Sequence, residues 1–427
     1  MENHLTHIIT ELVFQLAIIL AAAKAMGEIC ERYIKIPPVL GELSAGIIIG
    51  PFALGGIDLP FIGQLFGQTH GGLLEESISL VPVSTELWAV AQIAAVILLF
   101  SAGLETNLRQ FMKYAGPASL IAIGGVLIPF ACGVYGTIWF GFADSFSDPK
   151  ALFMGAILTA TSVGITARVL SDIKHLDSAE GVTVLAAAVL DDVLGILVLT
   201  VVVGISESGE VSLSDVAIVG GKAVGFWIAL TGIGILLSKY ISIFLDSFRV
   251  PGAAIALALS LALLAAGLAE SFGLAMIIGA YSMGLSLSGT KIAHRLEEPM
   301  RAVYNALVPI FFVVMGMLVD IPAMKGVLIF GAVITGLAVM SKVIGSAIPA
   351  LMTGFTKWGS WRIGIGMLPR GEVALIIAGI GLSRGIVGSD LFGVSIMMTV
   401  VTTLVAPIIL VPAFKNNKEG RRSSAKE

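Results

Sequence analysis

The sequence is poor in charged residues and in cysteine. Asp, Glu, Lys and Arg make up only 13% of its 427 residues, whereas about 25% is usual in soluble domains. This scarcity excludes a soluble globular protein, and it also excludes a disordered chain, because disorder requires low hydrophobicity and high net charge. The two cysteines, Cys30 and Cys132, stand alone in apolar sequence, so they form neither a disulfide framework nor a metal-binding motif.

Apolar residues take the place of the missing charges. They make up 57% of the chain, and the mean hydropathy is +0.99. Stretches of about 20 apolar residues, the length that crosses a bilayer as a helix, recur along the whole chain. Because no Lys or Arg occurs in residues 1–7, we expect the first stretch to be a true span and not a cleaved signal peptide. The pattern predicts an all-α polytopic membrane protein with spans at about 9–29, 37–56, 84–104, 116–141, 150–171, 181–204, 213–238, 251–269, 272–289, 301–321, 325–352, 361–383 and 389–414.

The positions of the basic residues predict the orientation. With thirteen spans and the basic tail in the cytoplasm, 17 Lys and Arg residues fall on the cytoplasmic side and only Lys150, Lys325 and Arg384 on the other. Cytoplasmic loops of membrane proteins are rich in Lys and Arg, as this arrangement requires. We therefore expect the N-terminus outside and the C-terminus in the cytoplasm.

Two spans have centres that are unusual for a membrane helix. The first reads TATSVG at 159–164, and the second reads GIGMLPRGE at 364–372. Both are predicted to be interrupted helices. They are seven spans apart, an odd number, so they run in opposite directions. This indicates two inverted repeats, spans 1–6 and 8–13, with a site near the membrane midplane. The alternative is that Gly and Thr only allow close helix packing there.

Charged residues inside the spans mark the candidate site, because a charge at membrane depth costs at least about 2.5–3.5 kcal/mol. Asp191 and Asp192 are adjacent near the middle of span 181–204. Successive helix residues point about 100° apart, so one carboxylate can face a neighbouring helix while the other faces a cavity. Such a group can hold a proton at one pH and a hard cation at another, since oxygen ligands suit hard cations. The alternative is a purely structural pair.

A third charge, Lys342, lies near the middle of span 325–352. It is too deep to extend its ammonium group easily to the membrane surface. Because an unpaired cation is costly at that depth, we expect an ion pair with Asp191 or Asp192. The pair either belongs to the ion site or is a static bridge that balances charge.

The interrupted spans supply further polar groups. Arg370 and Glu372 are expected to satisfy freed backbone groups or each other. In the first interrupted span, the hydroxyls of Thr159, Thr161 and Ser162 and the nearby carbonyls can offer neutral oxygens to an ion.

Two further charges, Glu42 and Arg168, lie near span ends. Arg168, at the end of the first interrupted span, is expected to be a cap or an anchor near the cytoplasmic side. Glu42 is expected either at the membrane interface or along the access path.

Several motifs resemble those of a known family. They resemble the monovalent cation:proton antiporter-2 family, and within it the bacterial NapA-type Na+/H+ antiporters. The resemblance covers essentially the whole chain, with the motifs in the family's order. The motifs are GELSAG at 41–46, LFSAGLE at 99–105, ATSVGITARVL at 160–170, LDDVLG at 190–195, PIFFV at 309–313 and PRGEV at 369–373.

The resemblance implies the fold and its division. It implies an NhaA/NapA-like antiporter fold of thirteen helices, with two inverted six-helix repeats and crossed discontinuous helices. It also implies a homodimer in the membrane lipid, whose core domain slides against a dimer domain to alternate access. The implied parts are a membrane antiporter domain at 1–414 and a short basic cytoplasmic tail at 415–427. The membrane domain is divided into a dimer domain at about 9–104 and 251–321, a core domain at about 116–204 and 325–414, and a linker helix at about 213–238.

The resemblance also implies the roles of the site residues. Asp192 matches the aspartate that carries the ion and the proton, Asp191 matches the neighbour that pairs with Lys342, and Thr161 lies at the Na+ site with both carboxylates. Asp-Asp in place of the Gln-Asp of the glutathione-gated potassium-efflux relatives favours Na+ or Li+ and electrogenic exchange. Exchange of K+ for protons is the alternative.

The resemblance further implies no cofactor beyond the transported ions and no nucleic-acid partner. The short tail is expected to carry no nucleotide-binding regulatory domain. The expected location is a bacterial inner membrane.

Two other classes of protein fit the sequence less well. An intramembrane aspartyl protease also needs two membrane aspartates, but there the acids come from separate helices. Here they are adjacent, and the other candidate, Asp320, sits at a span end. A channel is compatible with interrupted helices, yet a lysine beside the path would repel cations. A secondary antiporter is therefore the favoured function.

Overall fold

The computed structural model describes residues 2–59, 63–66, 82–208, 213–320, 327–415 and 418–422. Within these residues the chain is helical apart from one pair of two-residue antiparallel strands, β1 (Asp58–Leu59) and β2 (Gly63–Gln64). The α-helices are α1 (Glu2–Ile29), α2 (Pro38–Ile49), α3 (Thr85–Glu105), α4 (Leu108–Trp139), α5 (Pro149–Thr159), α6 (Val163–Asp172), α7 (Ala179–Ser208), α8 (Leu213–Asp246), α9 (Ala253–Ser271), α10 (Met276–Ser288), α11 (Lys291–Met317), α12 (Leu328–Met352), α13 (Lys357–Gly366), α14 (Glu372–Ser383) and α15 (Ser389–Lys415).

The helices are long and apolar enough for a membrane. Eleven segments of the described chain meet the length and hydropathy of a crossing, and two shorter apolar helices lie among them, at Met276–Ser288 and Val373–Leu382. The protein is thus a multi-pass membrane protein, as predicted. The count of thirteen spans stays a prediction, because two predicted spans contain helices shorter than a full crossing.

Two predicted spans are interrupted where the sequence indicated. The first stops at Thr159, the end of α5, and resumes at Val163, the start of α6. The Thr159 hydroxyl donates to the Ala156 carbonyl, one of the local bonds by which Thr competes with a helix. The second is open between α13 and α14, where Pro369 lacks an N–H and disfavours helix in the residue before it.

Reciprocal glycines bring three pairs of helices into backbone contact. A Cβ on any of these glycines would lie 1.9–2.5 Å from a carbonyl oxygen of the opposite helix, so only glycine fits. Such contacts are typical of membrane helices, which associate by close packing. The pairs are Gly46 of α2 with Gly316 of α11, Gly103 of α3 with Gly284 of α10, and Gly124 of α4 with Gly345 of α12.

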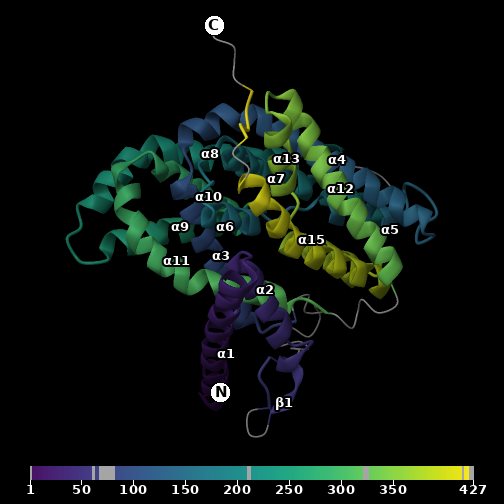
Figure 1. Cartoon of the computed structure of the whole chain (residues 1–427), viewed down its shortest axis with the longest axis horizontal. Helices are drawn as coiled ribbons and strands as arrows, with labels where there is room; N and C mark the ends of the chain where they lie inside the picture. The colour runs from purple at the N-terminus through teal and green to yellow at the C-terminus, as the bar shows by residue number, and fades with distance from the viewer. Residues whose placement is uncertain are drawn as a thin grey trace.

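The helices form two groups that meet mainly along α6, with a smaller contact between α4 and α10. The first helix group, α1–α3 with α9–α11, packs through α2, α3, α10 and α11, and the second helix group, α4–α7 with α12–α15, packs through α4, α7 and α12. Figure 1 shows α9, α10 and α11 on the left, and α4, α5, α12 and α15 on the right. Within the second group, α6 is the helix that also contacts α2 and α3. The two interrupted segments lie in the second group.

Candidate ion-binding site

The three charges predicted from the spans come together at one place. Asp191 and Asp192 of α7 are 1% and 5% exposed, and Lys342 of α12 is fully buried. The Lys342 ammonium lies 2.8 Å from Asp191 Oδ1, so these two residues form an ion pair. This is the pairing that the family resemblance implied.

Lys342 is held by two further acceptors. Its ammonium donates to the Thr159 carbonyl at 2.6 Å and to the Gly125 carbonyl at 2.8 Å. An ammonium group has three protons, so all three have an acceptor. Thr159 ends α5, and a helix end leaves its last carbonyls without intrahelical partners and carries partial negative charge. Lys342 therefore neutralises Asp191 and caps α5 at the same time, joining α4, α5, α7 and α12.

The two interrupted segments satisfy each other's backbone groups. Ser162 N donates to the Pro369 carbonyl at 2.7 Å. The Thr166 hydroxyl donates to the Gly366 carbonyl at 2.6 Å, and the Thr161 hydroxyl makes a longer contact of 3.4 Å with the Met367 carbonyl. Irregular backbone is tolerated at membrane depth only where protein or water satisfies it. The breaks are therefore stable because they lie against each other.

Arg370 is a fully buried cation that reinforces this contact. Its guanidinium donates to the Ala160 carbonyl at 2.6 Å and to the Ala338 carbonyl at 3.2 Å. Among the described residues it forms no ion pair. Of the two predicted roles, the structure shows the contact with freed backbone groups. The side chain of Glu372, which begins α14, lies outside the described part of the chain.

The hydroxyls expected to face an ion are buried near the break. Thr159, Thr161 and Ser162 are each at most 2% exposed. The Thr159 hydroxyl is used within α5 by its bond to the Ala156 carbonyl. The hydroxyl of Ser162 is enclosed and has no hydrogen-bond partner among the described residues. Ser162 is thus the hydroxyl best able to accept a new ligand.

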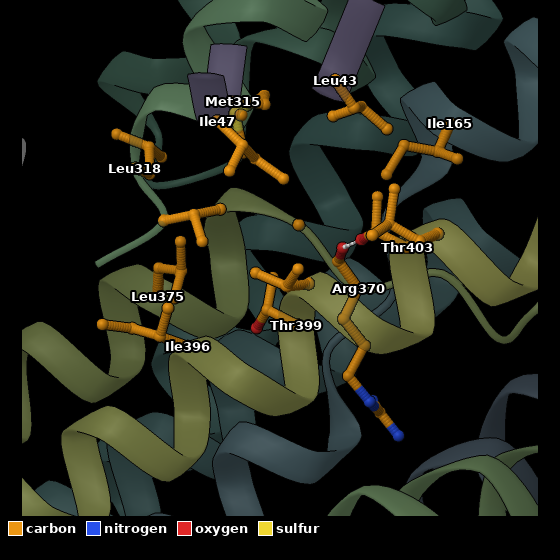
Figure 2. Close-up of a pocket in the computed structure, with 15 residues that line it drawn as sticks. Leu43, Ile47, Ile165, Met315, Leu318, Arg370, Leu375, Ile396, Thr399 and Thr403 are labelled. Carbon is orange, nitrogen blue, oxygen red and sulfur yellow. Dashed lines mark hydrogen bonds between the residues drawn. The ribbon is translucent and has the colours of Figure 1, made fainter. Parts of the chain in front are cut away.

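An apolar cavity lies beside the break, between the two helix groups. It is lined from α2, α6, α11, α14 and α15, and it reaches Arg370 and Gly371. Figure 2 shows the Arg370 guanidinium pointing away from the apolar lining, while its backbone carbonyl accepts a hydrogen bond from Thr403. Neither Asp191 nor Asp192 lines this cavity. It is therefore separate from the carboxylate pair.

Arg168, which was expected to be a cap or an anchor near the cytoplasmic side, is buried between helices. Arg168 is 6% exposed, and it pairs with Asp172 at 3.1 Å on the same helix and with Glu42 of α2 at 3.6 Å. Its guanidinium also lies 5.0 Å from the ring centroid of Tyr304 on α11. The helices α2 and α11 enclose this end of α6, which the position of Arg168 within its span does not reveal. The sequence signal for this pairing is the opposite charge of Arg168 and Glu42, which both lie near span ends.

The fold and the buried charges together define a class of protein. Paired interrupted helices around buried ionisable groups are the architecture of secondary transporters. The family model described as "Sodium/hydrogen exchanger, transmembrane" matches residues 17–416. The chain therefore belongs to the transmembrane sodium/hydrogen exchanger family. The finer assignment to the second antiporter subfamily stays a prediction.

Relatives and solved structures agree with the family. The "High-affinity Na(+)/H(+) antiporter NhaS3" of Synechocystis is 35% identical, over 96% of this chain and 92% of the relative. The "Na(+)/H(+)-K(+) antiporter GerN" of Bacillus cereus is 32% identical, over 97% and 99%. The fold matches the sodium proton antiporter MjNhaP1 of Methanocaldococcus jannaschii with a TM-score of 0.66 at 18% identity, over 96% of this chain and 99% of that one.

Proposed function

We propose that this protein is a secondary-active, electrogenic Na+/H+ antiporter that also accepts Li+, and that Asp192 binds the proton and the cation in turn. Family membership and relatives named as Na+/H+ antiporters support the exchange. The observation that carries the role of Asp192 is its place on α7, 5% exposed and directly beside the buried pair of Asp191 with Lys342.

The geometry suggests how two ions share one site. Lys342 forms an ion pair with Asp191, and in this proposal the neighbouring Asp192 supplies the carboxylate that a proton or a cation neutralises. Thr161 and Ser162 would add neutral oxygens, which suit a small hard cation. Because both ions use the same carboxylate, binding one expels the other. If only the loaded site crosses the membrane, the result is exchange.

The proposal includes thirteen crossings, with the N-terminus outside and the C-terminus in the cytoplasm. The uneven distribution of Lys and Arg supports it. In this arrangement the short α10 and the pair α13–α14 each complete a crossing. The contact between the two breaks supports spans 1–6 and 8–13 as inverted repeats.

The proposal also covers the moving parts. The first helix group corresponds to the predicted dimer domain, the second to the core domain, and α8 to the linker. In a homodimer within the inner membrane of a bacterium, the second group would slide against the first as an elevator. The sparse contact between the groups, mainly through α6, supports this division.

Exchange of K+ for protons is the alternative within the same mechanism. The name of the relative GerN includes K+ beside Na+, and this supports K+ exchange as an alternative.

Proton flux in liposomes tests the proposal. Purified protein is reconstituted, and Na+, Li+ or K+ gradients are imposed with and without a membrane voltage. We expect Na+ and Li+ to drive proton flux that responds to voltage. Flux driven by K+ but not by Na+ would establish the alternative.

The variant Asp192→Asn tests the carrier role in the same assay. We expect the flux to fall to that of empty liposomes while the protein remains folded. Asp177→Asn is the matched control, because Asp177 is exposed and lies in the loop before α7, so this variant should exchange like the wild type. Exchange at the wild-type rate by Asp192→Asn would refute the assignment.

A further inference from the structure

One face of α6 forms the seam between the two helix groups. Gly164, Arg168 and Ser171 lie on this face at helical spacing. Gly164 packs under the side chains of Leu98 and Phe311, where a Cβ would lie 3.3 and 3.4 Å from their nearest atoms. The seam at Gly164 is therefore apolar and tight.

The end of the same face is polar. Arg168 pairs with Glu42 of α2 at 3.6 Å, and the Ser171 hydroxyl lies 3.2 Å from Glu105 of α3. The ring of Tyr304 on α11 lies under the Arg168 guanidinium. One end of α6 thus holds three helices of the first group by polar contacts. In the proposed topology this end faces the cytoplasm.

The pair Glu42–Arg168 is held less firmly than the pair Asp191–Lys342. The distance is 3.6 Å against 2.8 Å, and one terminal guanidinium nitrogen of Arg168 has no hydrogen-bond partner among the described residues, whereas the Lys342 ammonium has three acceptors. Desolvation of a buried ion pair nearly cancels its attraction unless the geometry is excellent and all remaining polar atoms are satisfied. A pair of this quality separates readily when water reaches both partners.

The two pairs also differ in what they connect. Asp191 and Lys342 both belong to the second helix group, so they move together. Glu42 and Arg168 belong to different groups, and a sliding motion of α6 along α2 and α3 must part them. The apolar cavity begins beside this pair, since Leu43 and Ile165 line it. The pair therefore closes the cytoplasmic end of the seam beneath the cavity.

We propose that Glu42 and Arg168 form a gate that closes the cytoplasmic side of the ion pathway and opens once in each transport cycle. The gate rests on the alternating access proposed above. When the gate is closed, it favours the state in which the ion site is open to the outside. A weaker gate raises the population of the state that is open to the cytoplasm.

The variant Glu42→Gln tests the gate through the sidedness of binding. An apparent dissociation constant rises as the competent state becomes rarer and falls as it becomes commoner. In oriented vesicles we therefore expect the KM for Na+ to fall about threefold or more on the cytoplasmic side and to rise on the outer side. Glu28→Gln is the matched control, because Glu28 pairs with Arg32 at 3.7 Å on an exposed surface within the first group. Equal changes on both sides, or no change, would overturn the gate.

Cross-linking provides a second test that does not depend on affinity. Glu42→Cys and Arg168→Cys are combined with Cys30→Ala and Cys132→Ala, and a short bis-methanethiosulfonate joins the two positions through two disulfides, which a reductant can cleave. We expect exchange to fall to background on cross-linking and to return with reductant, whereas each single-cysteine variant keeps its flux with the same reagent. Undiminished exchange by cross-linked protein would overturn the gate. Absence of Na+-driven flux in the wild type would instead overturn the proposed function.

Discussion

At the residue scale, the described structure buries cations with different kinds of partner. Lys342 has a carboxylate and two backbone carbonyls, while Arg370 has only carbonyls. Arg362 of α13 donates to Glu180 of α7 at 2.7 Å and to a carbonyl of α15. Each arrangement joins elements that are far apart in the sequence. The buried charges therefore act as connectors, and Asp192 lies next to one of them.

Replacing Lys342 by Ala tests the connector at the centre of the site. The variant leaves the buried carboxylate of Asp191 without its cation and two carbonyls without a donor. Breaking a buried pair by removing one partner costs about 3–5 kcal/mol, so we expect a lower free energy of unfolding. If Asp191 binds a proton to relieve this cost, the voltage response of exchange changes instead. Thermal unfolding in detergent and flux under voltage measure the two effects.

The control for that variant is Lys222→Ala, because Lys222 lies in α8 with an exposed side chain. Lys222→Ala should change neither the free energy of unfolding nor the voltage response of exchange. Unchanged stability together with an unchanged voltage response of Lys342→Ala would contradict the importance of the ion pair.

At the scale of elements, the local sequence accounts for where helices stop, and packing accounts for where they meet. The breaks follow from Thr and Ser at 159–162 and from Gly and Pro at 366–371, residues that weaken a helix by known local effects. The cross-contacts, such as Ser162 N with the Pro369 carbonyl, join segments about half the chain apart. No local pattern encodes which carbonyl a freed N–H will reach.

The reciprocal glycines give a test at this scale. In Gly284→Ala, the new Cβ would lie 2.3 Å from the Phe100 carbonyl oxygen, so α10 and α3 must move apart. Overpacking of this kind costs about 1–3 kcal/mol, and we expect a lower unfolding temperature in detergent. Gly267→Ala on α9 is the control, since nothing lies within 4 Å of its added Cβ. Equal stability of the two variants would show that this contact is not tight.

At the scale of the whole molecule, proton and cation compete for one carboxylate in the proposed mechanism. A protonated site cannot bind Na+, so the apparent KM for Na+ should be highest at acid pH. It should fall about tenfold per pH unit while the site is mostly protonated and level off once the site is deprotonated. Proton flux as a function of Na+ concentration, from about pH 5 to about pH 9, measures this profile. A KM that does not change over that range would contradict competition.

The sequence by itself determined the class of protein, the interrupted spans, and the residues Asp191, Asp192 and Lys342, because hydropathy, helix-weakening residues and the cost of intramembrane charge are local properties. The sequence resemblance implied the pairing of Lys342 with Asp191, whereas tertiary structure alone decided that Arg370 reaches the other break and that Arg168 is enclosed beside Glu42. These pairings depend on which helices lie side by side and how they are rotated. That arrangement arises from close packing along the whole molecule and cannot be read from any one span.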